Sequence, residues 1–195
     1  MGLFTTEHGR AGYLADFVLY GITSIGLGAL LVILGPRGRA LEIAALVLLG
    51  LVAWTLVEYG LHRFVLHGIR PFRTWHLEHH RRPRALMGTP TVLSAALIFA
   101  LVFVPALALG DLWRACALTF GLLTGYLIYA VTHHAAHHWR AGSEWARQRK
   151  RAHALHHSPV EAPGRYGVTS GLWDVVFRTT GRRETRIKRE VGHAQ

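Results

Sequence analysis

Histidine is the residue type in this sequence whose number and spacing could support chemistry. Twelve of the fourteen histidines fall in four short blocks, and only His8 and His193 lie outside them. The blocks are His62 with His67, His76-Leu-Glu-His79-His80, His133-His-Ala-Ala-His137-His138, and His153-Ala-Leu-His156-His157. A neutral imidazole nitrogen binds iron, zinc, copper or nickel. The pattern therefore indicates a metal site, provided that the fold brings the blocks together.

The spacing within the blocks is typical of helices. Residues three and four apart share one face of a helix, and the second and last blocks both read His-x-x-His-His. The third block holds two i, i+4 pairs, one beginning at His133 and one at His134, so either could be the ligand pair. His62 and His67 are five apart and need a helix end or an irregular turn to converge.

The number of histidines favours two metal ions, because ten or more imidazoles exceed what one ion can use. The repeated motifs contain no cysteine, and their one carboxylate, Glu78, is expected to point away from the helix face that carries His76, His79 and His80. An all-nitrogen site is therefore expected. The single cysteine, Cys116, lies in an apolar run, which excludes an intramolecular disulfide, a thiolate zinc site and a protein-held iron–sulfur cluster. The alternative is that the histidines decorate a basic surface or form a passive zinc store.

Four apolar runs must position these blocks. They cover about 17–34, 40–57, 91–109 and 112–131, and each approaches the ~20 residues that cross a bilayer. Half of the chain (51%) is apolar and only 17% is charged, and the runs mostly lack the polar stripe of a soluble amphipathic helix. We predict an all-α integral membrane protein with about four transmembrane helices. Residues 1–195 would form a single domain, in which the cytoplasmic lobes 58–90 and 132–195 form a helical cap with a dimetal site.

Basic residues indicate the orientation. Of the 22 lysines and arginines, 19 lie on the histidine side of the predicted spans, and only Arg37, Arg39 and Arg114 lie on the other. By the positive-inside tendency, both termini and the metal site are expected to face the cytoplasm. The net charge of +11 suits an anionic membrane surface, and the apolar runs favour this partner over nucleic acid. Twenty of the 22 basic residues are arginines, typical of a GC-rich bacterial source, so a bacterial inner membrane is expected.

Two further motifs accompany the histidines. Glu58-Tyr-x-x-His62-Arg opens the series, and Gly-Val-Thr-Ser-x-x-Trp-Asp-x-Val-Phe closes it at 167–177. With the four blocks in this order, the sequence resembles the fatty acid hydroxylase/sterol desaturase superfamily of membrane histidine-motif diiron oxygenases. It looks closest to the fatty acid 2-hydroxylase branch. The matching motifs cover residues 58–179.

The resemblance implies a ligand set and a cofactor. Two iron ions are expected, with O2 as co-substrate, and zinc could replace iron in a purified sample. No catalytic residue beyond the metal ligands and no residue for another cofactor is implied. The implied ligands are His62, His67, His76, His79, His80, His133, His137, His153, His156 and His157.

The resemblance also implies an activity, the O2-dependent hydroxylation of a membrane lipid such as a fatty acyl chain. The sequence has no nucleotide-binding Gly-x-Gly-x-x-Gly, no haem-attachment motif and no iron–sulfur cysteines. Electrons are therefore expected from an external ferredoxin, cytochrome b5 or reductase. The basic cytoplasmic face could dock an acidic donor.

Three alternatives stay open. A carotenoid ring hydroxylase shares the histidine pattern, and a lipid or sterol desaturase requires the same metals. The alternative from another class is a non-catalytic metal-binding membrane protein. A transporter would place ionisable residues in mid-span, and the predicted spans carry almost none.

Two acidic residues could support the metal ligands. Glu58 lies one helical turn before His62 and could orient its second ring nitrogen, or it could pair with an arginine at the membrane interface. Asp174 is a second candidate acceptor. With Trp173, Val176 and Phe177, it could belong to a short interfacial helix that covers the site.

Overall fold

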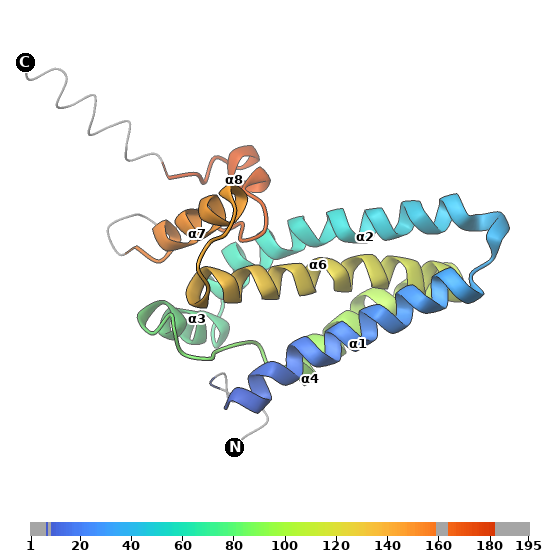
Figure 1. Ribbon diagram of the computed structural model, residues 1–195, viewed down its shortest axis with the longest axis horizontal. Helices are drawn as coiled ribbons and strands as arrows, with labels where there is room; N and C mark the ends of the chain where they lie inside the picture. Colours follow the sequence, from blue (N-terminus) through green and yellow to red (C-terminus); the bar gives the residue numbers. More distant parts are fainter. Residues whose placement is uncertain (1–6, 8, 159–163, 182–195) are drawn as a thin grey trace, which may run out of the picture. The chain divides into compact units, whose positions relative to one another are not determined.

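The protein is built from helices. The computed structural model describes residues 7, 9–158 and 164–181, coloured along the chain in Figure 1. Within these ranges there is no strand, only an isolated antiparallel bridge between Glu7 and Met87. The elements are α1 (Arg10–Leu34), η1 (Arg37–Arg39), α2 (Ala40–Gly60), η2 (Leu61–Leu66), α3 (Phe72–Arg81), α4 (Thr91–Ile98), η3 (Phe99–Phe103), α5 (Val104–Leu109), α6 (Leu112–His138), α7 (Glu144–His156) and α8 (Leu172–Val176). The prediction of an all-α protein is confirmed.

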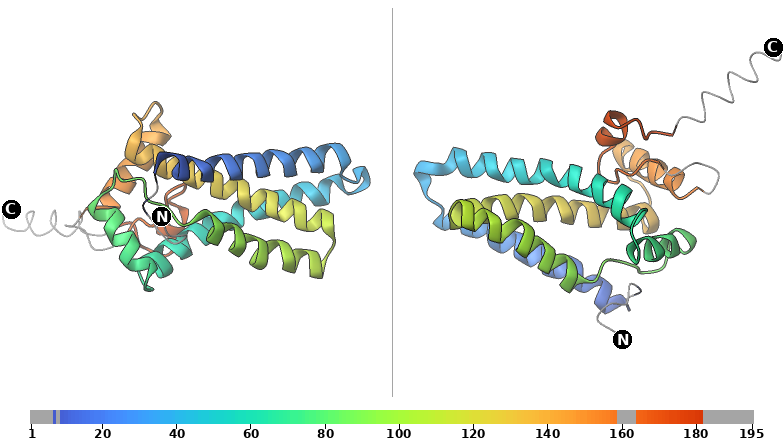
Figure 2. Two further views of the ribbon diagram at one scale, coloured as in Figure 1. Left: turned by 90° about the horizontal axis from the view of Figure 1, so that it is seen from below. Right: turned by 180° about the vertical axis from the view of Figure 1, so that it is seen from behind.

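Four helical stretches are long and apolar enough to cross a membrane. They are Arg10–Leu34, Arg37–Leu66, Thr91–Leu109 and Leu112–His138. Large apolar side chains on them are openly exposed, among them Val32 (86%), Leu41 (89%) and Leu101 (69%). Continuous exposure of this kind suits lipid rather than water. The prediction of four membrane-spanning helices is confirmed, and Figure 2 shows these long helices from two further sides.

The chain forms two compact units. The first comprises residues 1–54 and 81–131, and the second comprises residues 55–80 and 132–195. The first unit holds most of the membrane-spanning residues. All four histidine blocks belong to the second unit.

Close helix packing holds the first unit together. Leu31, Cys116 and Ala117 form its buried centre. A side chain at Gly121 would place its Cβ 2.0 Å from the carbonyl oxygen of Val47, so α2 and α6 approach at a glycine. Small residues permit such backbone approach in membranes, where packing stabilises helix association.

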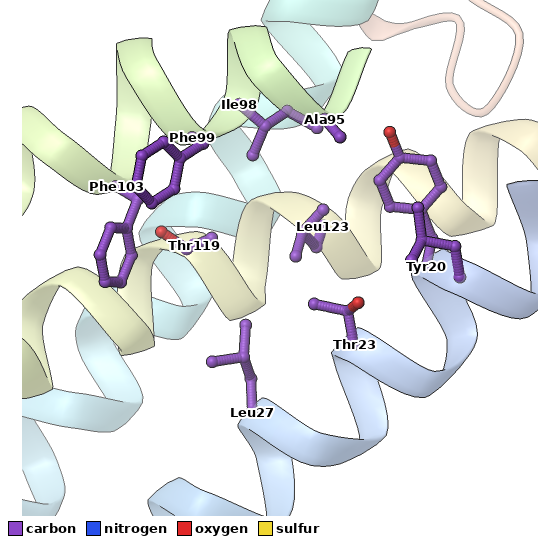
Figure 3. A pocket seen from close by; sticks show the side chains of 10 residues that line it. Tyr20, Thr23, Leu27, Ala95, Ile98, Phe99, Phe103, Thr119 and Leu123 are labelled. Atoms are coloured by element: carbon purple, nitrogen blue, oxygen red, sulfur yellow. The ribbon is translucent and has the colours of Figure 1, made fainter. Parts of the chain in front are cut away.

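A cavity of about 340 Å³ lies among α1, α4, η3 and α6 of the first unit (Figure 3). At one edge, the Tyr20 hydroxyl lies 2.6 Å from Ser94 Oγ and links α1 to α4. The lining is otherwise mostly apolar, as in many sites for hydrocarbon ligands. It consists of Leu19, Tyr20, Thr23, Leu27, Ala95, Ile98, Phe99, Phe103, Thr119 and Leu123.

Candidate metal centre

Ten histidines of the second unit gather in two groups of five. Within each group, one potential ligand atom per residue lies within 4.8 Å of the others. We call the groups cluster A and cluster B. Cluster A consists of His62, His67, His76, His80 and His156. Cluster B consists of His79, His133, His137, His153 and His157.

Helix α3 supplies histidines to both clusters. His76 and His80, four residues apart, belong to cluster A, whereas His79 between them belongs to cluster B. The His76 and His80 Nε2 atoms are 3.0 Å apart, because an i, i+4 pair lies on one stripe of the helix. The His-x-x-His-His motif thus lies at the boundary between two sites, which its spacing alone did not indicate.

Helix α7 and His157, the residue that follows it, also supply histidines to both clusters. His153 and His157 belong to cluster B, whereas His156 belongs to cluster A. The Ser143 hydroxyl begins the helix by accepting a hydrogen bond from the Ala146 amide, a usual N-cap. The clusters adjoin, since the rings of His157 and His80 stack with centroids 4.0 Å apart.

A π-helical turn brings the first histidine pair together. His62 is the second residue of η2 and His67 follows its last residue, and the His67 amide donates to the His62 carbonyl. This i→i+5 bond widens the turn, so residues five apart come onto the same side. Their ring centroids lie 5.3 Å apart. The sequence required an irregular turn here, and π-helices often occur at functional sites.

The third block contributes only one of its two pairs. His133 and His137 enter cluster B. His134 and His138 stack on each other with ring centroids 4.5 Å apart and belong to neither cluster. His8 and His193 lie outside the described residues.

The donor atoms fit bound cations. Five pairs of histidines approach through their Nε2 atoms, at distances from 2.8 to 3.1 Å. Lone pairs that converge in this way repel one another unless a proton or a metal ion lies between them. Neither group includes a cysteine or a carboxylate, so both are all-imidazole sites. Such donors suit first-row transition metals, and the clusters indicate metal binding.

Burial keeps these histidines neutral. Desolvation, reinforced by neighbouring histidines, lowers the pKa of His79 to about 4 and that of His80 to about 3. The pKa of His67 falls to about 4, first through burial and then through the charge that His156 would carry. A metal ligand must be deprotonated, so these side chains are ready to bind at neutral pH.

The metal-free protein is expected to lose stability on mild acidification. An unfolded histidine has a pKa near 6.5, above the folded values for His67, His79 and His80. Below pH 6.5 the unfolded chain therefore binds more protons than the folded chain, and the free energy of unfolding falls. Chelator-treated protein should show a falling thermal midpoint from pH 6.5 to 5, before most carboxylates titrate. A constant midpoint over this window would contradict the burial of these rings.

A loop after the last histidine block holds two rings of cluster A. The His62 Nδ1 lies 2.6 Å from the Tyr166 carbonyl oxygen, and the His156 Nδ1 lies 2.7 Å from that of Gly164. A carbonyl oxygen only accepts, so both Nδ1 atoms carry the proton. Each ring therefore presents the lone pair of Nε2 to cluster A. Sequence reasoning missed Gly164 and Tyr166, because they act through their backbone.

Glu58 supports this loop instead of contacting His62. Its side chain is 3% exposed and accepts hydrogen bonds from the amides of Val168 at 2.6 Å and Thr169 at 2.9 Å. The Thr169 hydroxyl donates to the other carboxylate oxygen. The expectation that Glu58 orients the second ring nitrogen of His62 is wrong, since a backbone carbonyl occupies that position.

Asp174 holds the same loop from α8. It is 3% exposed and accepts from the amides of Tyr166 at 2.8 Å and Gly167 at 2.9 Å. The Thr179 hydroxyl donates to it at 2.7 Å. The expectation that Asp174 accepts from one of the metal-ligand candidates is wrong, since its donors are the loop and Thr179.

Comparisons with known proteins identify a family for the region that contains this site. The sequence model described as fatty acid hydroxylase matches residues 47–179, a range that contains all ten clustered histidines. The chain is 34% identical over 149 residues to the dihydroceramide fatty acyl 2-hydroxylase FAH2 of Arabidopsis thaliana. It is 36% identical over 149 residues to the ceramide very long chain fatty acid hydroxylase SCS7 of Saccharomyces cerevisiae.

The coverage of these matches is partial. The alignment covers 71% of this chain and 61% of the Arabidopsis protein, and 67% of this chain and 36% of the yeast protein. A solved structure of full-length Scs7p, in which only the hydroxylase domain is visible, is similar with a TM-score of 0.70 and 29% identity. That similarity covers 89% of this chain and 67% of the other. The chain therefore spans less than two thirds of the Arabidopsis relative.

Proposed function

The chain belongs to the fatty acid hydroxylase family, and on this premise we propose that it hydroxylates a membrane lipid in an O2-dependent reaction. The substrate would be a fatty acyl chain or a lipid that carries one. The observation that supports this most strongly is the pair of all-imidazole clusters, A and B. We assign residues 1–195 to a single membrane domain whose lobes 58–90 and 132–195 carry the metals.

The clusters would hold two iron ions, each through five neutral imidazoles. Bound iron would activate O2, the oxidant, so that one oxygen atom enters a C–H bond while two external electrons and two protons reduce the other oxygen atom to water. The ten histidines would fix the ions, and burial of rings such as His62 and His153 would limit competing reactions with water. No side-chain general base is required. Zinc could occupy the same nitrogens in a purified sample.

The lipid substrate fits the apolar character of the first unit. The cavity among α1, α4, η3 and α6 has a mostly hydrocarbon lining, which suits an acyl chain better than a polar ligand. Packing against a hydrocarbon lining distinguishes no single carbon of an acyl chain. The position of the chain, rather than a polar contact, would therefore determine which carbon reacts. The names of the Arabidopsis and yeast relatives, a fatty acyl 2-hydroxylase and a ceramide fatty acid hydroxylase, support an acyl substrate.

Electrons would come from a separate ferredoxin, cytochrome b5 or reductase. Helix α7 presents exposed arginines at Arg147 and Arg151, and a basic surface attracts an acidic partner. The excess of arginine over lysine supports a bacterial inner membrane. The excess of basic residues on the histidine side supports an orientation in which both termini and the metal clusters face the cytoplasm.

Lipid analysis tests the proposed reaction. Cells that express the chain are grown under ¹⁸O2, and their total lipids are compared by mass spectrometry with those from cells that express His79→Ala. A lipid that gains one ¹⁸O atom only with the intact chain is the expected result. Loss of two hydrogens would indicate a desaturase, and an oxygenated carotenoid ring would indicate a ring hydroxylase. No difference, with a reducing partner present, would favour a non-catalytic metal-binding protein.

A further inference from the structure

We propose that the loop 164–169 is a positioning element that makes cluster A the tighter of the two metal sites. Glu58 and Asp174 would be its positioning residues, acting on the ions through the loop and two histidine rings. The inference rests on the proposed function only in that both clusters bind a metal ion. It concerns the order of metal affinity and does not depend on the lipid that reacts.

The loop contacts two of the five histidines of cluster A. Its two carbonyl acceptors, at Gly164 and Tyr166, bind the Nδ1 atoms of His156 and His62. These rings come from distant parts of the chain, α7 and η2. A histidine whose second nitrogen donates to a fixed acceptor has a set tautomer and ring orientation and is a more basic ligand. One loop therefore sets two of the five donors of cluster A at once.

The backbone of the loop is held in an unusual shape. Arg165, between the two carbonyl acceptors, has φ 57°, in the left-handed region that few residues other than glycine adopt. The Arg165 amide donates to the Thr179 carbonyl oxygen at 2.9 Å. Such a conformation persists where its surroundings hold it in place. The contacts of Glu58 and Asp174 supply that constraint.

The two carboxylates form hydrogen bonds with four successive residues of the loop. Asp174 accepts from the amides of Tyr166 and Gly167, and Glu58 accepts from those of Val168 and Thr169. Both are almost fully buried, where a charge-assisted hydrogen bond is stronger than at the surface. These four hydrogen bonds therefore fix the backbone from Tyr166 to Thr169, and with it the position of the Tyr166 carbonyl group.

Cluster B has weaker outer support among the described residues. The Nδ1 atoms of His79, His153 and His157 are buried, and no described residue pairs with them by a hydrogen bond. Their rings are positioned by packing against other histidines, such as His153 against His137 with centroids 4.6 Å apart. Loss of an outer contact to a metal-bound histidine typically costs about 10- to 100-fold in metal affinity. We expect the metal in cluster B to leave first.

Zinc serves as a probe, because it binds imidazole and undergoes no redox change. The purified full chain is loaded with zinc and titrated with a chelator, and the zinc that stays bound is measured. The wild type should release two ions in two separate steps. In Asp174→Asn, the side-chain NH2 group of asparagine would face the backbone N–H of Tyr166 or Gly167. Both groups are donors, so one hydrogen bond to the loop would be lost. The tighter step should weaken by about 10- to 100-fold, while the weaker step should not move.

Single-cluster backgrounds assign the steps. In a His137→Ala chain, which impairs cluster B, Asp174→Asn should still weaken the remaining ion. In a His67→Ala chain, which impairs cluster A, it should leave the remaining ion unchanged. Glu144→Gln is the control, because this exposed carboxylate on α7 pairs with Arg147 and takes part in none of the loop contacts described above. It should alter neither step.

A second variant and a second readout separate positioning from general damage. One oxygen of Glu58 accepts from both the Val168 and Thr169 amides, so the amide oxygen of Glu58→Gln can keep both bonds, whereas Asp174 uses one oxygen for each amide. Glu58→Gln should therefore shift the same step by less, and it replaces Asp174→Asn if that chain does not fold. Hydrogen exchange at the amides of Tyr166 and Gly167 should accelerate in Asp174→Asn. An equal shift of both steps, or an unchanged tighter step in two folded variants, would overturn the inference.

The outcomes distinguish this inference from the proposed reaction. A wild-type chain that binds two zinc ions with the expected Asp174→Asn shift, yet oxidises no lipid, would remove the proposed reaction and support the inference. A wild-type chain that hydroxylates lipid, together with an Asp174→Asn variant in which both metal-release steps shift equally, would support the proposed reaction and overturn the inference. A wild type that binds neither zinc nor iron would overturn both.

Discussion

Replacement of His156 by alanine is expected to abolish lipid hydroxylation and to weaken metal binding in cluster A by more than about 100-fold, beyond the usual cost of an outer contact. His156 is 6% exposed, and its Nε2 lies 3.1 Å from that of His67. Its Nδ1 also holds the Gly164 carbonyl oxygen. The substitution would therefore remove one donor and release one end of the loop.

The measurements are the ¹⁸O-labelled lipid product and the metal content per chain. His138→Ala is the matched control, because His138 is exposed and belongs to neither cluster. It should retain both ions and near-normal product. Full turnover in His156→Ala would contradict the assignment of cluster A.

Gly167→Ala is expected to disrupt the loop, although it adds only a methyl group. A Cβ at this position would lie 1.9 Å from the Ser170 carbonyl oxygen and 3.0 Å from Asp174 Oδ2. Real Cβ atoms do not approach backbone oxygen so closely, so the loop or α8 must move. Overpacking of this kind costs about 1–3 kcal/mol in the free energy of unfolding. Displacement of the Tyr166 carbonyl should also weaken the metal in cluster A about 10-fold or more.

Thermal unfolding in detergent and zinc retention test this expectation. Gly142→Ala is the control, because a Cβ there would meet no other atom within 4 Å. It should change the unfolding midpoint and zinc retention little. If Gly167→Ala behaves like Gly142→Ala, the loop tolerates movement and its role in positioning is wrong.

The two candidate metal sites have unequal surroundings. Cluster A is bounded by a loop whose backbone is fixed by Glu58 and Asp174, whereas the rings of cluster B lie mainly on α3, α6 and α7. A protein can tune a metal through such outer contacts as well as through its ligands. This asymmetry is a property of the fold, since all ten ligand candidates are the same residue type.

The sequence by itself determined the fold class and the candidate ligands. A membrane-spanning helix requires a continuous apolar run, so the four such runs in the sequence predict the four spans. Histidines three and four apart identify helices with a ligand-bearing face. The His62–His67 spacing of five also required an irregular turn, which the structure forms as the π-helix η2.

Only the tertiary structure decided how the histidines divide and what supports them. His79 faces cluster B while His76 and His80 face cluster A, because each stripe of α3 meets a different neighbour, and neighbours are not encoded in local spacing. The choice of His133 over His134 has the same cause. The acceptors for His62 and His156 are backbone carbonyls, which every residue possesses and which no side-chain pattern marks. Their positions depend on long-range contacts from Glu58 and Asp174 to the loop, so folding alone brings them into place.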